Sequence, residues 1–113
     1  MSRDWHLYAD DIVEACGKIQ RFLHGMKYEA FVADERTRDA VIRNIEIIGE
    51  AAKNLPDHVT ALAPQIEWRK VCGMRDVLAH AYFGVDIDFV WDTATTRVAD
   101  LEAAVRSLLA AQP

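Results

Sequence analysis

One short stretch of the sequence carries the residues best suited to acid–base chemistry on a phosphate. It runs from Trp68 to Phe83 and places Arg75, Asp76, His80 and Tyr82 among apolar neighbours. Burying an arginine or a histidine beside apolar groups is costly unless the charge is paired. An imidazole exchanges a proton near neutral pH, and a guanidinium can hold two phosphate oxygens at once. These residue types fit cleavage of a phosphodiester, with His80 moving a proton and Arg75 stabilising the charge that develops on the phosphate.

Helical spacing decides which of these side chains can meet. Asp76 and His80 are four residues apart, which puts them on one helix face within hydrogen-bond reach. The carboxylate would fix the tautomer of the imidazole and favour its charged form. Arg75 is about 140° from His80 around a regular helix, so its long side chain must bend toward the imidazole. Tyr82 is about 200° from His80 and can converge with it where the helix ends, which Gly84 makes reasonable.

Apolar residues recur at helical spacing almost throughout the chain, and no segment alternates long enough to predict a strand. The first stripe runs from Trp5 to Met26, with Gly25 near its C-terminal end. The second helix is predicted to follow an N-cap at Asp34 and to close at Pro56. The stretch from Lys27 to Ala33 is expected to be a linker that packs on the core.

The second half of the chain predicts two more long helices. Residues 57–63 can form a short helical turn, and a third helix runs from Glu67 to about Phe83, where Gly84 would stop it. Asp86 or Asp88 can cap the last helix, whose stripe ends at Leu108. Trp68 and Trp91 are expected in the core. Residues 1–113 are therefore predicted to be a single all-α domain, a small up-and-down bundle of four main helices and a possible short fifth.

The composition excludes several classes of protein. The chain has 113 residues, 51% of them hydrophobic, which is enough for one packed domain. Five glycines and three prolines argue against a β-sandwich or barrel with many turns. The net charge is −5, with 13 basic and 18 acidic side chains, which disfavours a nucleic-acid binder that relies on bulk positive charge. A small local basic site remains compatible with this charge.

Cysteine and histidine usage predicts neither a disulfide framework nor a metal site. Cys16 and Cys72 lack CxxC spacing and are interpreted as buried thiols in a reducing compartment. The four histidines include no HxxxH pair, so we expect no metal ion and no other cofactor. Early charges at the N-terminus and the absence of a long apolar run predict neither a secretion signal nor a membrane span, hence a cytoplasmic protein.

The spacing Arg75-x4-His80-x-Tyr82 resembles the R-x4-H-x-Y signature of the HepT-like toxins, a branch of the HEPN superfamily of small helical proteins. The resemblance extends over nearly the whole chain and implies an HEPN-like fold. The further matching segments are Asn44 to Lys53 (NIEIIGEAAK), Ile66-x-Trp68, Gly73-Met74-Arg75, and Tyr82 to Asp86 followed by Val90-Trp91.

The resemblance implies a metal-independent endoribonuclease that serves as the toxin of a toxin–antitoxin pair. The implied partner is a small nucleotidyltransferase antitoxin of the MNT type, which transfers AMP to the motif tyrosine, here Tyr82. It also implies a homodimer whose motif helices line one cleft. Modified Tyr82 would place a bulky phosphate beside His80 and occupy Arg75. Two histidines across a twofold axis would supply both the base and the acid that cleavage by the RNA 2′-hydroxyl requires.

Several supporting residues follow from their positions near this motif. Gly49, in mid-helix, predicts close packing of another helix, because glycine there costs about 1 kcal/mol relative to alanine. Glu50 beside it could then support the site by reaching Arg75 or Lys70. The candidate RNA contacts are Lys53, Arg69 and Lys70, although exposed cations on helix faces are the ordinary case.

Other interpretations stay open. Arg75 could form an ordinary salt bridge with Asp76 or a neighbouring helix, and His80 could satisfy a carbonyl at a helix end. Tyr82 could be a core aromatic with its hydroxyl at the rim. The protein could also be a non-catalytic module that binds, and is modified by, a nucleotidyltransferase. A third alternative is a helical protein whose pocket takes free nucleotides.

Overall fold

The structure, a computed structural model, describes residues 3–80 and 86–111, and at positions 79 and 80 it describes the backbone. All regular secondary structure within those ranges is helical, which confirms the predicted fold class. The four long helices are α1 (Trp5–Leu23), α3 (Glu35–Ala52), α5 (Trp68–His80) and α7 (Val98–Ala111). The short helices are α2 (Tyr28–Ala33), α4 (Asp57–Thr60) and α6 (Ile87–Asp92), and a π-helical segment (Thr93–Arg97) joins α6 to α7.

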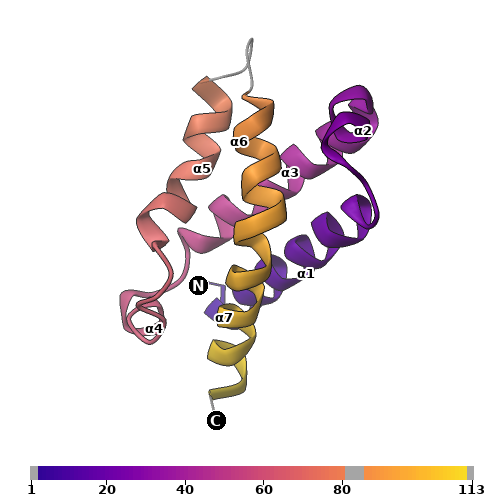
Figure 1. Cartoon of the computed structure of the whole chain (residues 1–113). Helices are drawn as coiled ribbons and strands as arrows, with labels where there is room; N and C mark the ends of the chain where they lie inside the picture. Colours follow the sequence, from indigo (N-terminus) through magenta and orange to yellow (C-terminus); the bar gives the residue numbers. More distant parts are fainter. Residues whose placement is uncertain (1–2, 81–85, 112–113) are drawn as a thin grey trace.

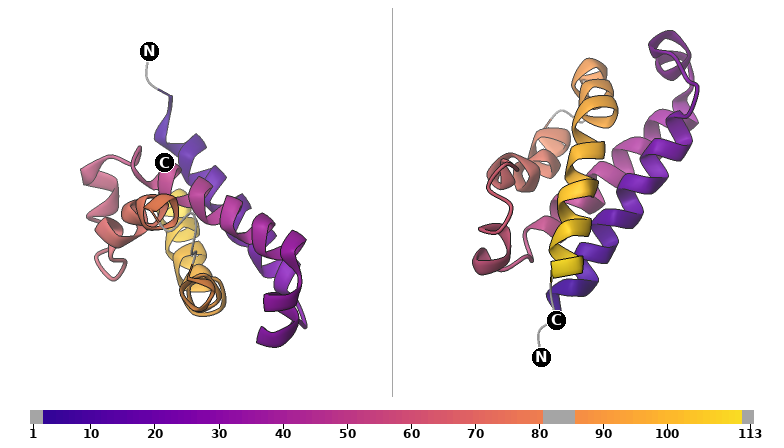
Figure 2. Two further views of the ribbon diagram at one scale, coloured as in Figure 1. Left: turned by 90° about the horizontal axis from the view of Figure 1, so that it is seen from above. Right: turned by 60° about the horizontal axis from the view of Figure 1, so that its bottom comes forward.

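The long helices pack as a chain of neighbours (Figure 1). α1 and α3 run antiparallel and side by side, connected at one end through α2. α5 packs on the other side of α3, and α7 packs on α1. α6, the π-helical segment and α7 form one continuous rod, here called the α6–α7 rod (residues 87–111), which runs back beside α5 (Figure 2). The site helix α5 therefore has α3 on one side and the α6–α7 rod on another.

Predicted start and stop signals are found where the sequence places them. Asp34 caps α3 by accepting a hydrogen bond from the amide of Thr37 at 3.0 Å. Asp86 caps α6 by accepting one from the amide of Phe89 at 3.1 Å. Gly25, just beyond α1, has a φ of 73°, the left-handed conformation that glycine adopts without a steric penalty. These signals fix where the chain turns between helices.

Three boundaries differ from prediction. The expected linker from Lys27 to Ala33 does pack on the core, but it contains helix α2, because a stretch without glycine or proline can bury Phe31 in helical form. α3 ends at Ala52 rather than at Pro56, and the chain reaches the proline through turns. The last predicted helix is divided by the π-helical segment, which a three-and-four spacing of apolar residues does not reveal. The expected stop at Gly84 lies outside the described residues.

The core confirms the apolar stripes. The large apolar side chains that are fully buried come from α1, α2, α3, α4 and the α6–α7 rod: Ile12, Ile19, Phe31, Val41, Ile45, Ile48, Val59, Val90, Val98 and Val105. Trp68 and Trp91 are half-buried and pack against this core. The Trp68 indole donates a hydrogen bond to the carbonyl of Ala63 at 3.0 Å, and the Trp91 ring lies 5.2 Å from that of Phe31. Within the described ranges, no helix is long and apolar enough to cross a bilayer.

α3 and α5 are in close contact at Gly49. A methyl group built on Gly49 would lie 3.3 Å from the carbonyl oxygen of Val71 and 3.4 Å from the amide nitrogen of Arg75. Both contacts are with backbone atoms of α5, which cannot move aside like a flexible side chain. The prediction that this glycine permits close helix packing is therefore confirmed.

Substitution Gly49→Val should push α5 away from α3 and lower the free energy of unfolding by about 1–3 kcal/mol, the usual cost of overpacking a core. Gly17→Val in α1 is the matched control, because the nearest atom there is the end of the Arg21 side chain, at 3.2 Å, which can swing away. Chemical denaturation followed by circular dichroism measures both. Equal losses in the two variants would contradict a special role for Gly49.

Candidate active site

Arg75 is held on the surface of α5 by a carboxylate from the neighbouring helix. Its guanidinium Nη1 donates a hydrogen bond to Oε2 of Glu50, which follows Gly49 in α3. Of the two partners considered for Glu50, the structure therefore selects Arg75, and Lys70 pairs with Glu67 at 2.7 Å instead. The contact is also what an ordinary salt bridge to a neighbouring helix looks like. Both side chains are about half exposed, at 52% and 56%.

Arg75 lies in a shallow cleft of about 280 Å³ formed by α1, α3, α5 and the residues just before α1, here called the Arg75 cleft. Three arginines line it, and each has a carboxylate partner. Arg3 donates to Asp11 at 2.8 Å and lies over the ring of Tyr8, and Arg43 lies 3.7 Å from Glu46. The three cations are thus balanced by the carboxylates of Asp11, Glu46 and Glu50. An anionic ligand would have to exchange with these carboxylates.

Sequence reasoning missed two of these arginines. Arg43 precedes Glu50 by seven residues and so lies on the same face of α3, a signal that was available from spacing. Arg3 lies before the first helix, where no periodicity applies, and its place in the cleft follows from the packing of α1 on α3.

The structure describes Asp76 completely, only the backbone of His80, and none of Tyr82. Asp76 is exposed on α5. His80 belongs to the last turn of α5, about 140° around the helix from Arg75. Its side chain is outside what the structure describes, as is the whole of Tyr82. The convergence of Arg75, His80 and Tyr82 accordingly stays a prediction.

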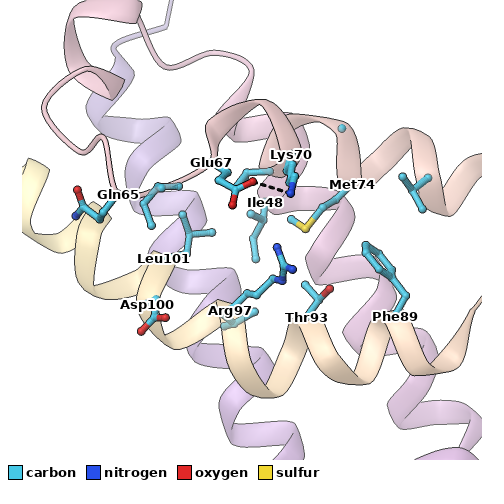
Figure 3. Close-up of a pocket in the computed structure, with 15 residues that line it drawn as sticks. Ile48, Gln65, Glu67, Lys70, Met74, Phe89, Thr93, Arg97, Asp100 and Leu101 are labelled. Carbon is cyan, nitrogen blue, oxygen red and sulfur yellow. Dashed lines mark ion pairs between the residues drawn. The ribbon is translucent and has the colours of Figure 1, made fainter.

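Of the three predicted RNA contacts, only Lys70 lines one of the two clefts. Lys53 is exposed just beyond α3, and its charge acts on the thiol of Cys72. Arg69 is exposed in the first turn of α5. Lys70 lies in a second, larger cleft (Figure 3). None of the three lines the Arg75 cleft.

This second cleft has a volume of about 520 Å³ and is called here the α5–α7 cleft. Its walls are α5 and the α6–α7 rod, and Ile48 of α3 contributes to its floor. Arg97 extends from the rod into the opening, opposite the pair formed by Lys70 of α5 and Glu67 just before that helix. Sequence reasoning did not predict this cleft, because its walls come together only when α5 and the rod pack on different neighbours.

The cysteines are unsuited to nucleophilic chemistry. Burial raises the pKa of the Cys16 thiol to about 12, and burial also raises the pKa of Cys72. Both thiols are therefore protonated at neutral pH. Cys16 is buried as predicted, whereas Cys72 is only partly buried. Among the residues that the structure describes, no three histidine, cysteine, aspartate or glutamate side chains gather to form a metal site.

Comparison with known proteins identifies the family of the chain. Residues 12–108 match the family model described as "Ribonuclease HepT-like". The chain belongs to the HepT-like ribonuclease family. No solved structure shows a significant match.

Curated relatives carry the same description. The chain is 43% identical to "Probable ribonuclease HepT" of Thermococcus cleftensis over 108 residues, 96% of this chain and 98% of the relative. It is 36% identical to a protein named as a putative RNase of Caldanaerobacter subterraneus, covering 90% of this chain and 91% of the relative. A protein of Methanocaldococcus jannaschii, also named as a putative RNase, is 38% identical over 85% of this chain and 79% of its own length. The family expected from the motif is confirmed, and it is a family of ribonucleases.

Replacing Arg75 with alanine should change the free energy of unfolding by less than about 1 kcal/mol, because exposed ion pairs contribute little to stability. Arg106→Ala in α7 is the control, since Arg106 is also an exposed arginine paired with a carboxylate, that of Glu102 at 2.8 Å within the same helix. Urea denaturation of both variants measures the change. A loss of about 3–5 kcal/mol in the free energy of unfolding for Arg75→Ala alone would contradict this prediction. It would show that the Arg75–Glu50 pair is needed for the stability of the fold.

Proposed function

We propose that this protein is the endoribonuclease toxin of a toxin–antitoxin pair, acting without a metal ion through Arg75, His80 and Tyr82. The observation that carries the proposal is the family match, which spans residues 12–108 and so includes all three positions. The exposed guanidinium of Arg75, paired with one carboxylate, supports it. RNA is the substrate that follows from membership of a ribonuclease family.

The proposed reaction uses the 2′-hydroxyl of the RNA as the nucleophile. One His80 accepts the 2′-hydroxyl proton as the 2′-oxygen attacks phosphorus and forms a 2′,3′-cyclic phosphate. The bond between phosphorus and the 5′-oxygen breaks, and a protonated imidazole returns a proton to that oxygen. Arg75 stabilises the negative charge that grows on the phosphate oxygens in between. Asp76, four residues before His80, orients the imidazole.

A homodimer supplies what one chain lacks. Each chain has a single motif histidine, whereas the reaction needs a base and an acid at the same phosphodiester. Twofold pairing of α5 with its copy would bring His80 and the partner subunit's His80 to one cleft. It would also bring two Arg75 guanidiniums to that cleft, which raises the local positive potential in a chain of net charge −5.

Glu50 has a positioning role in this proposal. Its carboxylate accepts a hydrogen bond from the Arg75 guanidinium and so holds it toward α3. An RNA phosphate offers the same bidentate acceptor geometry as the carboxylate and can take its place.

The antitoxin in this proposal is an MNT-type nucleotidyltransferase that modifies Tyr82. The tyrosine oxygen attacks the α-phosphorus of ATP, pyrophosphate leaves, and the phenolic proton passes to solvent. The attached AMP brings negative charge and bulk to the region of Arg75 and His80 and so competes with the RNA phosphate. Both partners and ATP would meet in the cytoplasm.

Purified protein should cleave single-stranded RNA in the presence of EDTA. Cleavage should fall by about 10²–10³ in Arg75→Ala, which loses charge stabilisation, and by about 10²–10⁴ in His80→Ala, which loses proton transfer. Arg106→Ala is the control for loss of one surface arginine. Equal absence of cleavage in the wild type and in His80→Ala would instead support a non-catalytic module that only binds its nucleotidyltransferase.

Incubation with the nucleotidyltransferase and ATP should add AMP to the wild-type protein and abolish cleavage. Intact-mass spectrometry should detect the adduct in the wild type but not in Tyr82→Phe. Tyr28→Phe is the control, because the Tyr28 hydroxyl is occupied by a hydrogen bond to Asp88. An unchanged mass in the wild type, or an adduct retained in Tyr82→Phe, would refute modification at this tyrosine.

A further inference from the structure

The α5–α7 cleft contains a buried hydroxyl without a partner. Thr93 is 2% exposed, lines the cleft, and its Oγ1 has no hydrogen-bond partner among the described residues. Its neighbours behave differently: the hydroxyls of Thr95 and Thr96 donate to the carbonyls of Trp91 and Asp92 at 2.7 and 2.6 Å. An unsatisfied buried hydroxyl lowers stability, and such groups in native proteins call for an explanation. Thr93 also begins the π-helical segment, a distortion that occurs often at functional sites.

Gly73 supplies an independent observation on the opposite wall. It lies in the middle of α5, where glycine is unfavourable, and a methyl group built there would meet no described atom within 4 Å. Gly49, by contrast, is needed because α5 packs directly against it. The packing of the described residues therefore does not explain Gly73, which leaves one side of the cleft open to an external group.

The remaining lining fits a flat heterocycle better than a phosphate. Most of the wall is apolar, contributed by Ile48, Val71, Met74, Phe89, Val98 and Leu101. The charged groups at the rim balance, with Lys70 and Arg97 against Glu67 and Asp100. The cleft therefore offers no net attraction for an anion. It does offer donors and acceptors side by side, which is the pattern on the edge of a nucleobase.

We propose that the α5–α7 cleft binds a nucleobase splayed out from the RNA strand, with Thr93 bonding to the base edge and Phe89 and Arg97 packing on its face. Single-stranded RNA is recognised in this way, by unstacked bases held against aromatic rings and guanidinium planes. Arg75 and Asp76 of the motif lie in the sequence between the cleft residues Met74 and Val77, and Gly73 directly precedes Met74. A base in the cleft would thus place its own backbone along the helix that carries the motif.

The inference rests on the proposed ribonuclease function, but its first test needs no cleavage. Backbone amide NMR signals are followed while the wild-type protein is titrated with AMP, GMP, CMP and UMP, and with ribose 5-phosphate as the control that lacks a base. Signals of Gly73, Phe89 and Thr93 should shift with at least one mononucleotide. Comparable shifts with ribose 5-phosphate would mean that the cleft takes the phosphate, and would overturn the proposal.

Two variants separate binding from folding. Thr93→Val should weaken binding of the preferred mononucleotide by about tenfold, the effect of one lost hydrogen bond. Its melting temperature should be unchanged or higher, because a buried unsatisfied hydroxyl is removed. Thr95→Val, on the same segment, should leave nucleotide binding unchanged. Equal effects of the two valine variants on binding would overturn the role of Thr93.

Gly73→Leu fills the open side of the cleft and should abolish mononucleotide binding while preserving the fold. Ala103→Leu adds the same side chain to an exposed position of α7 and is its control. Normal nucleotide binding by Gly73→Leu would overturn the proposal. If this variant binds nucleotides normally and also converts a dimer into a monomer in sedimentation, the cleft accommodates a second copy of the chain rather than a base.

A cleavage assay then connects the cleft to the substrate. The wild-type protein should no longer cleave an RNA oligonucleotide at a preferred site when the neighbouring position is abasic. Thr93→Val should cleave unmodified RNA without preferring that site. Full cleavage without any base preference in the wild type would refute the subsite while leaving the ribonuclease intact. Mononucleotide binding without cleavage would support the subsite and refute the ribonuclease.

Discussion

The close approach of α3 and α5 at Gly49 is the constraint on which the rest of the site depends. Because the glycine has no side chain, the backbone of α5 at Val71 and Arg75 can lie against α3. That contact fixes the position of the Arg75 backbone relative to α3. Glu50, the residue after Gly49 in α3, is then within hydrogen-bond reach of the Arg75 guanidinium. A larger residue would move the helix that carries the motif as a whole. The packing of two helices thus determines the place of a charged group that is itself half exposed.

The electrostatics of the protein are local rather than global. Each arginine of the Arg75 cleft has its own carboxylate, and the charges lining the α5–α7 cleft are also balanced. Exposed ion pairs of this kind contribute little to the free energy of unfolding. Replacing one of them with a contact to a ligand therefore costs little free energy. An acidic chain can therefore bind RNA where a phosphate replaces a carboxylate, without a basic surface that would attract every polyanion in the cell.

Periodicity and capping residues were sufficient to predict most of the scaffold. The apolar stripes, the caps at Asp34 and Asp86 and the glycine at position 25 report local physics, so a single sequence reveals them. Helix α2 and the π-helical segment depend on tertiary packing and were missed. The same division holds at the site. Gly49 and Glu50 were predictable from their place beside each other on one helix, whereas Arg3 and Thr93 enter their clefts only through the contacts of α1 and the α6–α7 rod.

The geometry of α5 bears on how many chains a complete site needs. Arg75 faces α3 and the Arg75 cleft, whereas position 80 is within about 20° of Gly73 and about 40° of Asp76 around the same helix. Gly73 and the exposed Val77 line the α5–α7 cleft, on the far side of the helix from Glu50. Arg75 and position 80 are thus about 140° apart around a regular helix. If both groups act on one phosphodiester, the long Arg75 side chain must bend round α5 toward position 80, and the need for two histidines favours a cleft to which each of two chains contributes both groups.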